Sequence, residues 1–139
     1  MILLDTNVLS AMMRDAPDAA VEAWLDRTPA ESVWTTAVTV FEIRYGLEVL
    51  PLGRRRRRLE VAFAATIEAE LEGRVVPFDA PAAEAAGKIA AELRRIGRTL
   101  EIRDAQIAGI TAVRKAALAT RNARDFDATG LTLIDPWAA

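Results

Sequence analysis

Short apolar runs alternate along the chain with longer segments in which apolar residues recur every three or four positions. The short runs are typical of buried strands in a parallel sheet, and the longer spacing is typical of helices with one apolar face. Strands are expected at residues 2–4, 32–35, 75–78, 117–120 and 131–134. The alternation predicts an α/β sandwich with a mainly parallel sheet, and no linker or repeat divides residues 1–139, so we expect a single domain.

Capping residues predict where several helices begin. Thr6 and Asn7 can cap a short helix that ends near Met13, because a side-chain oxygen there accepts a hydrogen bond from an unpaired N–H group. Asp18 and Thr39 are expected to cap two later helices in the same way. Further helices are expected at residues 59–71, 82–96 and 102–114.

Acidic residues stand where strands end or helices begin. Asp5 follows the first apolar run, and Glu42, Asp104 and Asp125 lie near the start of a helix or just past a strand. Open parallel sheets place ligands and chemistry at the carboxyl ends of their strands, so we expect these side chains to meet there. Two carboxylates about 4 Å apart repel by on the order of 4 kcal/mol at an effective dielectric of 20, so a cation must offset their charge.

The chain contains no histidine and no cysteine. This composition excludes Ser-His-Asp and Cys-His catalysis, and it excludes zinc sites built from histidine or thiolate. Hard oxygen ligands alone select Mg²⁺ or Mn²⁺. Such an ion polarises phosphoryl oxygens and lowers the pKa of a bound water, which becomes the nucleophile, so the missing histidine is no obstacle to hydrolysis.

Each acid also has a purely local explanation. The spacing Thr39-x-x-Glu42 matches a capping box, in which the carboxylate only closes the start of a helix. Asp104 stands near a helix start, where the helix dipole favours a carboxylate. Asp125 can cap the turn before Phe126. The joint arrangement, rather than any single acid, therefore favours a metal site.

Charge and hydropathy add two expectations. The net charge is −2, yet Arg54, Arg55, Arg56, Arg57 and Arg58 form an unbroken basic run. Such a run is most often a solvated face, and its alternatives are contacts with the backbone of a nucleic acid or a partner surface. No apolar run approaches the roughly 18 residues that span a bilayer, and no secretion signal is visible, so a cytoplasmic location without a membrane is expected.

Four motifs in order resemble the PIN-domain ribonucleases and, among these, the VapC-type toxins of bacterial toxin–antitoxin pairs. The matching stretches are Leu4-Asp5-Thr6-Asn7, Thr39-x-x-Glu42 with Tyr45-Gly46, Asp104-Ala105-Gln106-Ile107-Ala108, and Ala119-Thr120-Arg121-Asn122-x-x-Asp125-Phe126. The resemblance extends to the closing Ile134-x-Pro136-Trp137 and so covers nearly the whole chain.

The resemblance implies a PIN-like five-stranded parallel sheet and Mg²⁺-dependent cleavage of RNA phosphodiester bonds, with Mn²⁺ as the alternative ion. It also implies a homodimer and a VapB-like antitoxin whose tail enters the cleft. Asp5, Glu42 and Asp104 match the family's acidic triad, which is catalytic and binds the metal. Supporting roles fall to five further residues, Thr6, Asn7, Thr120, Asn122 and Asp125.

Two questions stay open at this point. Either Asn122 or Asp125 takes the place of the fourth acid, because relatives differ in which position carries it. The alternative to a nuclease is a catalytically idle PIN-like module that binds RNA or a partner. A phosphoacceptor receiver domain needs a lysine after a late strand, and neither Lys88 nor Lys115 stands there.

Overall fold

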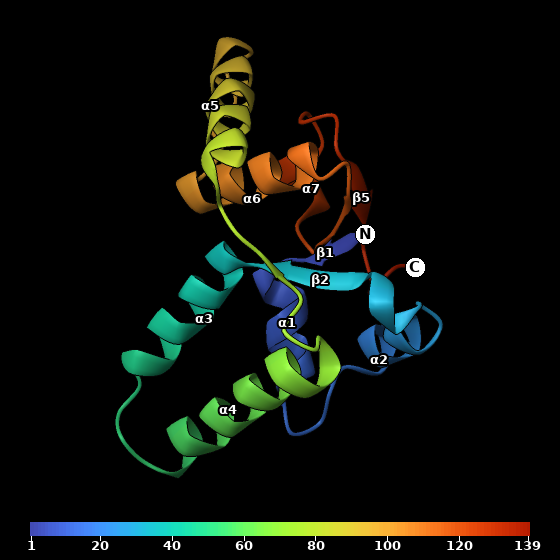
Figure 1. Cartoon of the computed structure of the whole chain (residues 1–139), viewed down its shortest axis with the longest axis vertical. Helices are drawn as coiled ribbons and strands as arrows, with labels where there is room; N and C mark the ends of the chain where they lie inside the picture. Colours follow the sequence, from blue (N-terminus) through green and yellow to red (C-terminus); the bar gives the residue numbers. More distant parts are fainter.

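A five-stranded sheet runs through the middle of the molecule, and every pair of neighbouring strands in it is parallel (Figure 1). The computed structural model describes all residues from 1 to 139. The strands are β1 (Ile2–Leu4), β2 (Val33–Thr36), β3 (Val75–Val76), β4 (Ala117–Ala119) and β5 (Thr132–Ile134). Their order across the sheet is β3-β2-β1-β4-β5, so β1 is central and the predicted parallel α/β architecture is confirmed.

Helices cover both faces of this sheet. They are α1 (Thr6–Met12), α2 (Ala19–Asp26), α3 (Ala37–Glu48), α4 (Arg54–Ala65), α5 (Ala80–Arg95), α6 (Ile102–Val113) and α7 (Ala123–Phe126). A 3-10 turn, η1 (Ala30–Ser32), precedes β2, and a π-helical turn, η2 (Thr66–Glu70), extends α4. In Figure 1, α1 to α4 lie on one side of the sheet and α5 and α6 lie on the other. None of the helices is both long and apolar enough to span a membrane.

The core consists of two apolar clusters, one on each face of the sheet. Successive residues of β1 point to opposite faces, so Leu4 packs in the cluster beneath α1 to α4 and Leu3 packs in the cluster beneath α5 and α6. Both leucines are fully buried. The strand that leads into Asp5 is therefore fixed from both sides.

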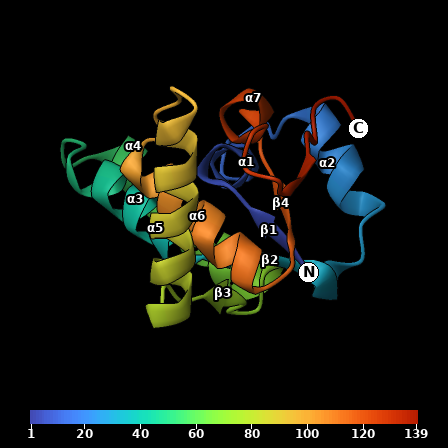
Figure 2. The ribbon, with the colours of Figure 1, turned by 90° about the horizontal axis from the view of Figure 1, so that it is seen from above.

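The helices α5 and α6 cross at close range (Figure 2). Gly109 of α6 makes this approach possible, because a Cβ there would lie 2.7 Å from the Cβ of Ala86 and closer still to the carbonyl of Ala82. Any larger residue at this position would push α5 away from α6. The close crossing fixes α6 against α5, and the first turn of α6 carries Asp104.

The starts of two helices differ from the sequence prediction. Asp5 itself, rather than Thr6 or Asn7, caps α1 by accepting a hydrogen bond from the Thr6 N–H. Thr36 caps α3 in place of Thr39, because β2 continues to Thr36 and its Oγ1 accepts the Thr39 N–H at 3.1 Å. The helix therefore starts at Ala37 and Glu42 falls in its second turn, so the predicted capping box is wrong.

The arginine run also lies differently from the prediction. The helix was expected to start at Leu59, yet α4 starts at Arg54 and the whole run forms its first turns. Asp18 caps α2 as predicted by accepting the N–H groups of Ala20 and Val21, and Asp79 caps α5 by accepting the Ala82 N–H. The run is thus an ordered helical surface at the far end of α3 (Figure 1).

Candidate active site

Asp5 occupies the centre of the candidate site, at the carboxyl end of β1. Its side chain is only 5% exposed, and both carboxylate oxygens accept hydrogen bonds. Oδ1 accepts from the Thr6 N–H at 2.8 Å, and Oδ2 accepts from Thr120 Oγ1 at 2.8 Å and from Asn7 Nδ2 at 3.4 Å. Burial raises the pKa of Asp5, and these hydrogen bonds act in the opposite direction.

Asn7 ties the ends of β1 and β4 together. Its Nδ2 also lies 3.3 Å from Thr120 Oγ1, and its Oδ1 accepts the Arg121 N–H at 3.0 Å. Thr120 is fully buried and in turn accepts the Asn122 N–H at 3.0 Å. The supporting residues predicted around Asp5 therefore form one hydrogen-bonded network across two neighbouring strands.

Glu42 faces Asp5 from the second turn of α3. Thr6 donates its hydroxyl to Glu42 Oε1 at 3.1 Å, so one residue after Asp5 positions a second acid. On the other side, Arg103 Nη1 lies 3.8 Å from Glu42 Oε2. Partial burial raises the pKa of Glu42, while Thr6 and Arg103 lower it and Asp5 raises it.

Asp104 lies in the first turn of α6 and is partly buried. Glu101 caps this helix by accepting the N–H groups of Arg103 and Asp104 at 3.0 and 3.3 Å. Burial, together with the negative charges of its acidic neighbours, raises the pKa of Asp104 to about 6. Those neighbours are Asp5, Glu101, Asp125 and Glu42. The predicted acids are therefore brought together as one electrostatically coupled cluster.

The structure separates the two candidates for the fourth acid. Asn122 is exposed, and only its backbone is tied to Thr120. Asp125 lies one turn further on in α7, also exposed, and its charge raises the pKa of both Asp5 and Asp104. Its side chain forms no hydrogen bond, so the expected capping of the turn before Phe126 is wrong. Asp125 thus belongs to the charged cluster, and Asn122 lies at its margin.

The acids suit a hydrated ion better than a tight cage. No three of them lie close enough together to bind one ion directly. The donor set is carboxylate oxygen throughout, and Mg²⁺ typically keeps several waters and is held by one or two carboxylates. Asp5 and Asp104 fit such a cation, since burial and the neighbouring negative charges raise their pKa values and the ion would offset those charges.

Sequence reasoning missed two charged residues of this site, Glu101 and Arg103. Arg103 forms the only ion pair that involves Asp5, Glu42, Asp104 or Asp125. The signal was present, because both residues stand within three positions of Asp104 on the same first turn. In such a sequence, a charged residue on the same helix turn as a predicted metal ligand is a reasonable candidate for a further residue of the site.

The arginine run lies away from the acids. Arg56 is only 16% exposed and pairs with Glu48 and Glu60, so it serves the packing of α4 against α3. Arg58 pairs with Asp15 at 3.1 Å. Three arginines, Arg54, Arg55 and Arg57, remain exposed and form no ion pair. They are the part of the run that is free to meet another molecule.

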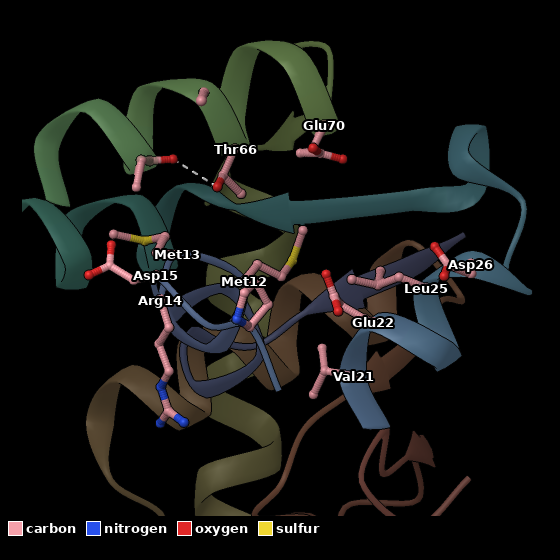
Figure 3. Close-up of a pocket in the computed structure, with 13 residues that line it drawn as sticks. Met12, Met13, Arg14, Asp15, Val21, Glu22, Leu25, Asp26, Thr66 and Glu70 are labelled. Atoms are coloured by element: carbon pink, nitrogen blue, oxygen red, sulfur yellow. Dashed lines mark hydrogen bonds between the residues drawn. The ribbon is translucent and has the colours of Figure 1, made fainter. Parts of the chain in front are cut away.

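A cavity of about 450 Å³ lies apart from the acids, between α1, α2 and α4 (Figure 3). Met12, Val21 and Leu25 give it an apolar lining. Its charged residues are mostly acidic, namely Asp15, Glu22, Asp26 and Glu70 against Arg14. None of the predicted site residues lines it.

Known proteins share both the sequence and the fold. A profile of the PIN domain matches residues 2–130. A VapC ribonuclease of Sinorhizobium fredii is 36% identical over 137 residues, which are 99% of this chain and 98% of the relative. Toxin FitB of Neisseria gonorrhoeae is 34% identical over 137 residues, 99% of each chain. A chain in the crystal structure of FitAcB from the same organism superposes on this chain with a TM-score of 0.90 and 34% sequence identity, and the alignment covers 100% of each chain. This chain therefore belongs to the PIN-domain family and, within it, to the VapC-type ribonuclease toxins.

Proposed function

We propose that this chain is a Mg²⁺-dependent endoribonuclease that hydrolyses RNA phosphodiester bonds and acts as the toxin of a toxin–antitoxin pair. The observation that carries the proposal is the meeting of Asp5, Glu42, Asp104 and Asp125 at one edge of the sheet, where burial and the neighbouring negative charges raise the pKa of Asp104 to about 6. A cluster of mutually repelling carboxylates at a sheet edge is what a divalent cation stabilises. PIN-domain nucleases use such ions, and residues 2–130 match that domain. We take residues 1–139 to act as one PIN-like domain.

The three acids of the triad have different tasks in this proposal. Asp5 and Asp104 hold the cation, and Glu42 accepts hydrogen bonds that orient the attacking water. When bound, Mg²⁺ or Mn²⁺ supplies a polarised phosphoryl oxygen and a water of lowered pKa. Thr120 and Asn7 fix the Asp5 carboxylate, and Thr6 fixes Glu42 through the 3.1 Å contact to Oε1. Positioning of this kind is how phosphoryl transfer is accelerated, since the protein does little covalent chemistry itself.

The test is cleavage of RNA by the purified chain with Mg²⁺, with Mn²⁺ and with a chelator. Asp104→Asn should abolish cleavage and leave the fold intact, and Asp26→Asn, an exposed acid outside the cluster, is the matched control. Metal-dependent cleavage that is lost only in Asp104→Asn supports the nuclease. A parent that binds RNA but cuts none with either ion would support the idle module instead.

We propose that Arg54, Arg55 and Arg57 contact the RNA backbone, since they are exposed and without ion pairs. Arg56 and Arg58, which the sequence grouped with them, are already paired with acids of this chain. The three free arginines supply positive charge at the end of α3 opposite the acids. A long RNA that reaches from the acids along α3 would pass them.

We propose a homodimer that forms through α3. Phe41, Tyr45 and Val49 recur every four residues and form an exposed apolar stripe along this helix. Phe41 and Tyr45 are each 59% exposed, and their rings stack with centroids 6.3 Å apart. We propose that this stripe packs against the same stripe of a second copy of the chain, which would bury it in a symmetric interface. Light scattering on the parent and on Tyr45→Glu tests this, since the charged variant should be monomeric.

We also propose a VapB-like antitoxin as the partner that restrains the enzyme. One solved structure of the same fold, at 25% identity, is described as a member of the VapBC family of toxin–antitoxin systems. A basic side chain of the antitoxin would enter the acidic cluster and compete there with the metal. The acidic lining of the cavity between α1, α2 and α4 suits a basic, amphipathic segment of the same partner. Co-expression with the adjacent small reading frame should relieve growth arrest in the cytoplasm and yield a complex.

A further inference from the structure

Arg103 holds a position that the roles given to the acids do not explain. It is the second residue of α6, directly before Asp104, and its side chain is 42% exposed, against 21% for Glu42. Its Nη1 lies 3.8 Å from Glu42 Oε2 and forms no hydrogen bond with it. Its Nε donates a hydrogen bond to Glu101 Oε1 at 3.3 Å. The guanidinium is therefore anchored through Nε, while Nη1 is only loosely paired with Glu42 and the side chain is partly open to solvent.

The chemistry of the substrate requires a cation at this place. Asp5, Glu42, Asp104, Asp125 and Glu101 give the site a strongly negative field, which repels a phosphodiester. A single divalent ion offsets only part of this charge. Among the residues that form ion pairs, Arg103 is the one basic side chain within reach of the cluster. A guanidinium binds phosphate oxygens through two parallel N–H donors, which a lysine cannot reproduce.

The ion pair with Glu42 is easily exchanged. Exposed pairs of this length contribute little to stability, so the guanidinium can leave Glu42 at small cost. A cation that enters beside Glu42 competes for the same carboxylate and repels Arg103. The Nη1 end of Arg103 would then be free to bind a phosphate, while Nε stays bonded to Glu101 and holds the side chain in place.

We propose that Arg103 is a substrate-contacting residue that pairs with Glu42 in the free protein and binds a non-bridging oxygen of the RNA phosphate in the complex. The inference rests on the proposed ribonuclease function. The proposal predicts two opposite effects of the Arg103 side chain. Without RNA, Arg103 weakens metal binding because its positive charge neutralises Glu42 and repels a cation held beside it by Asp5 and Asp104. With RNA, it strengthens substrate binding.

The test measures the metal affinity and the RNA affinity of Arg103→Gln separately. Mn²⁺ affinity is measured without RNA by electron paramagnetic resonance, and affinity for a mixed-sequence single-stranded RNA is measured in Ca²⁺ over a series of salt concentrations. We expect Mn²⁺ to bind several-fold more tightly and RNA to bind about tenfold more weakly, since a hydrogen bond to a charged group is lost. The salt slope should fall by about 0.7, the value for one lost phosphate contact on a single strand.

Two matched variants isolate the contact from general charge effects. Arg114→Gln removes an exposed arginine at the other end of the same helix, about 16 Å away, and should change neither affinity. Arg103→Lys keeps the positive charge but lacks the two parallel N–H donors of the guanidinium. It should restore the parent's Mn²⁺ affinity while recovering only part of the RNA affinity.

Unchanged RNA affinity and salt slope in Arg103→Gln, with a parent that cleaves RNA, would overturn the inference and leave Arg103 as a partner of Glu42 only. Equal losses in Arg103→Gln and Arg114→Gln would also overturn it. Failure of the nuclease proposal is distinguishable, because it shows as a parent without metal-dependent cleavage. In that case an RNA affinity that still depends on Arg103 would support the contact without the reaction.

Discussion

Thr120 Oγ1 lies 2.8 Å from Asp5 Oδ2, and this hydrogen bond joins the ends of two neighbouring strands in the centre of the sheet. Thr120 is fully buried and Asp5 nearly so. The bond therefore acts in a place with little water, where it lowers the pKa of a carboxylate that burial raises. Thr120 therefore favours the charged form of Asp5, the form in which we propose that it binds the metal.

Thr120→Val tests this dependence with a side chain of nearly the same shape. The pKa of Asp5 should rise further, because the hydrogen bond that favours its charged form is gone. The acidic limb of the pH–cleavage profile should then move to higher pH. Urea unfolding should show a loss of about 1 kcal/mol for one buried hydrogen bond. Thr99→Val, at an exposed position, should change neither the profile nor the stability.

Asp104 makes the metal-free protein less stable as the pH rises. Its pKa is about 6 in the folded protein, against an ordinary value of 3.8, so the folded state holds the proton more tightly. The stability that this proton provides is complete below pH 3.8 and is lost as the pH rises through about 6. The side chain is only partly buried, so the loss is on the order of 1 kcal/mol after solvent screening.

Asp104→Asn should remove this pH dependence. In chelator, the variant should melt at a higher temperature than the parent at pH 7 and at a similar temperature near pH 3.8. Asp26→Asn, which removes an acid outside the cluster, should have the same melting temperature as the parent at both pH values. A parent and an Asp104→Asn variant with equal melting temperatures at pH 7 would contradict the charge coupling.

Mg²⁺ should stabilise the folded chain by mass action. The gain follows RT ln(1 + [L]/Kd), which is about 2.7 kcal/mol at a concentration 100 times Kd. The effect should be larger at pH 7 than at pH 5, because the ion must displace the proton from Asp104. Melting curves over a Mg²⁺ series at both pH values measure this. An equal response of Asp104→Asn at pH 7 would place the ion elsewhere.

Asn122 and Asp125 should respond differently to substitution. Asp125→Ala should weaken metal binding without a loss of stability, because its side chain caps nothing and acts through its charge on Asp5 and Asp104. Asn122→Asp should tighten metal binding, since an added charge strengthens a hard-ion site. Calorimetric metal titration and urea unfolding of both variants separate the effects. A stability loss in Asp125→Ala with unchanged metal affinity would contradict this assignment.

The three unpaired arginines of α4 should strengthen RNA binding through the backbone, whatever the base sequence of the RNA. Replacing Arg54, Arg55 and Arg57 by glutamine should lower RNA affinity and reduce the salt slope by about 2, at about 0.7 for each lost phosphate contact. Arg94→Gln with Arg95→Gln, at the end of α5, is the control for lost charge. If the triple variant and this control have the same salt slope as the parent, the run is a solvated face.

Periodicity predicted the positions of the strands well, most clearly for β1, β4 and β5, which are short runs that end at Asp5, Thr120 and Asp135. The end of β1 at Asp5 is an example, since burial of Leu3 and Leu4 on opposite faces leaves no choice of register. The start of α3 was predicted less well. Thr36 and Thr39 are both good caps, and only the length of β2 decides between them. Local propensity does not contain that tertiary fact.

The same limit applies to the candidate site. The acids were predictable because they follow strands or begin helices, where the fold brings them to one edge. The pairing of Arg103 with Glu42 was not, because it joins α6 to α3 and depends on how these helices sit on the sheet. The separation of Asp125 from Asn122 depends on the single turn of α7, which places one charge toward the cluster and leaves the amide at its edge.

The central place of β1 has a consequence for how the protein is made. Strand β1 leaves the ribosome before its neighbour β4, which is formed by residues 117–119. Asp5 can meet Thr120 only after the residues between them have been synthesised. A chain that has not yet formed β4 therefore carries Asp5 without this hydrogen bond. The two ends of the candidate site can meet only after the intervening helices have formed or have left room for β4 beside β1, so the site is completed late in folding.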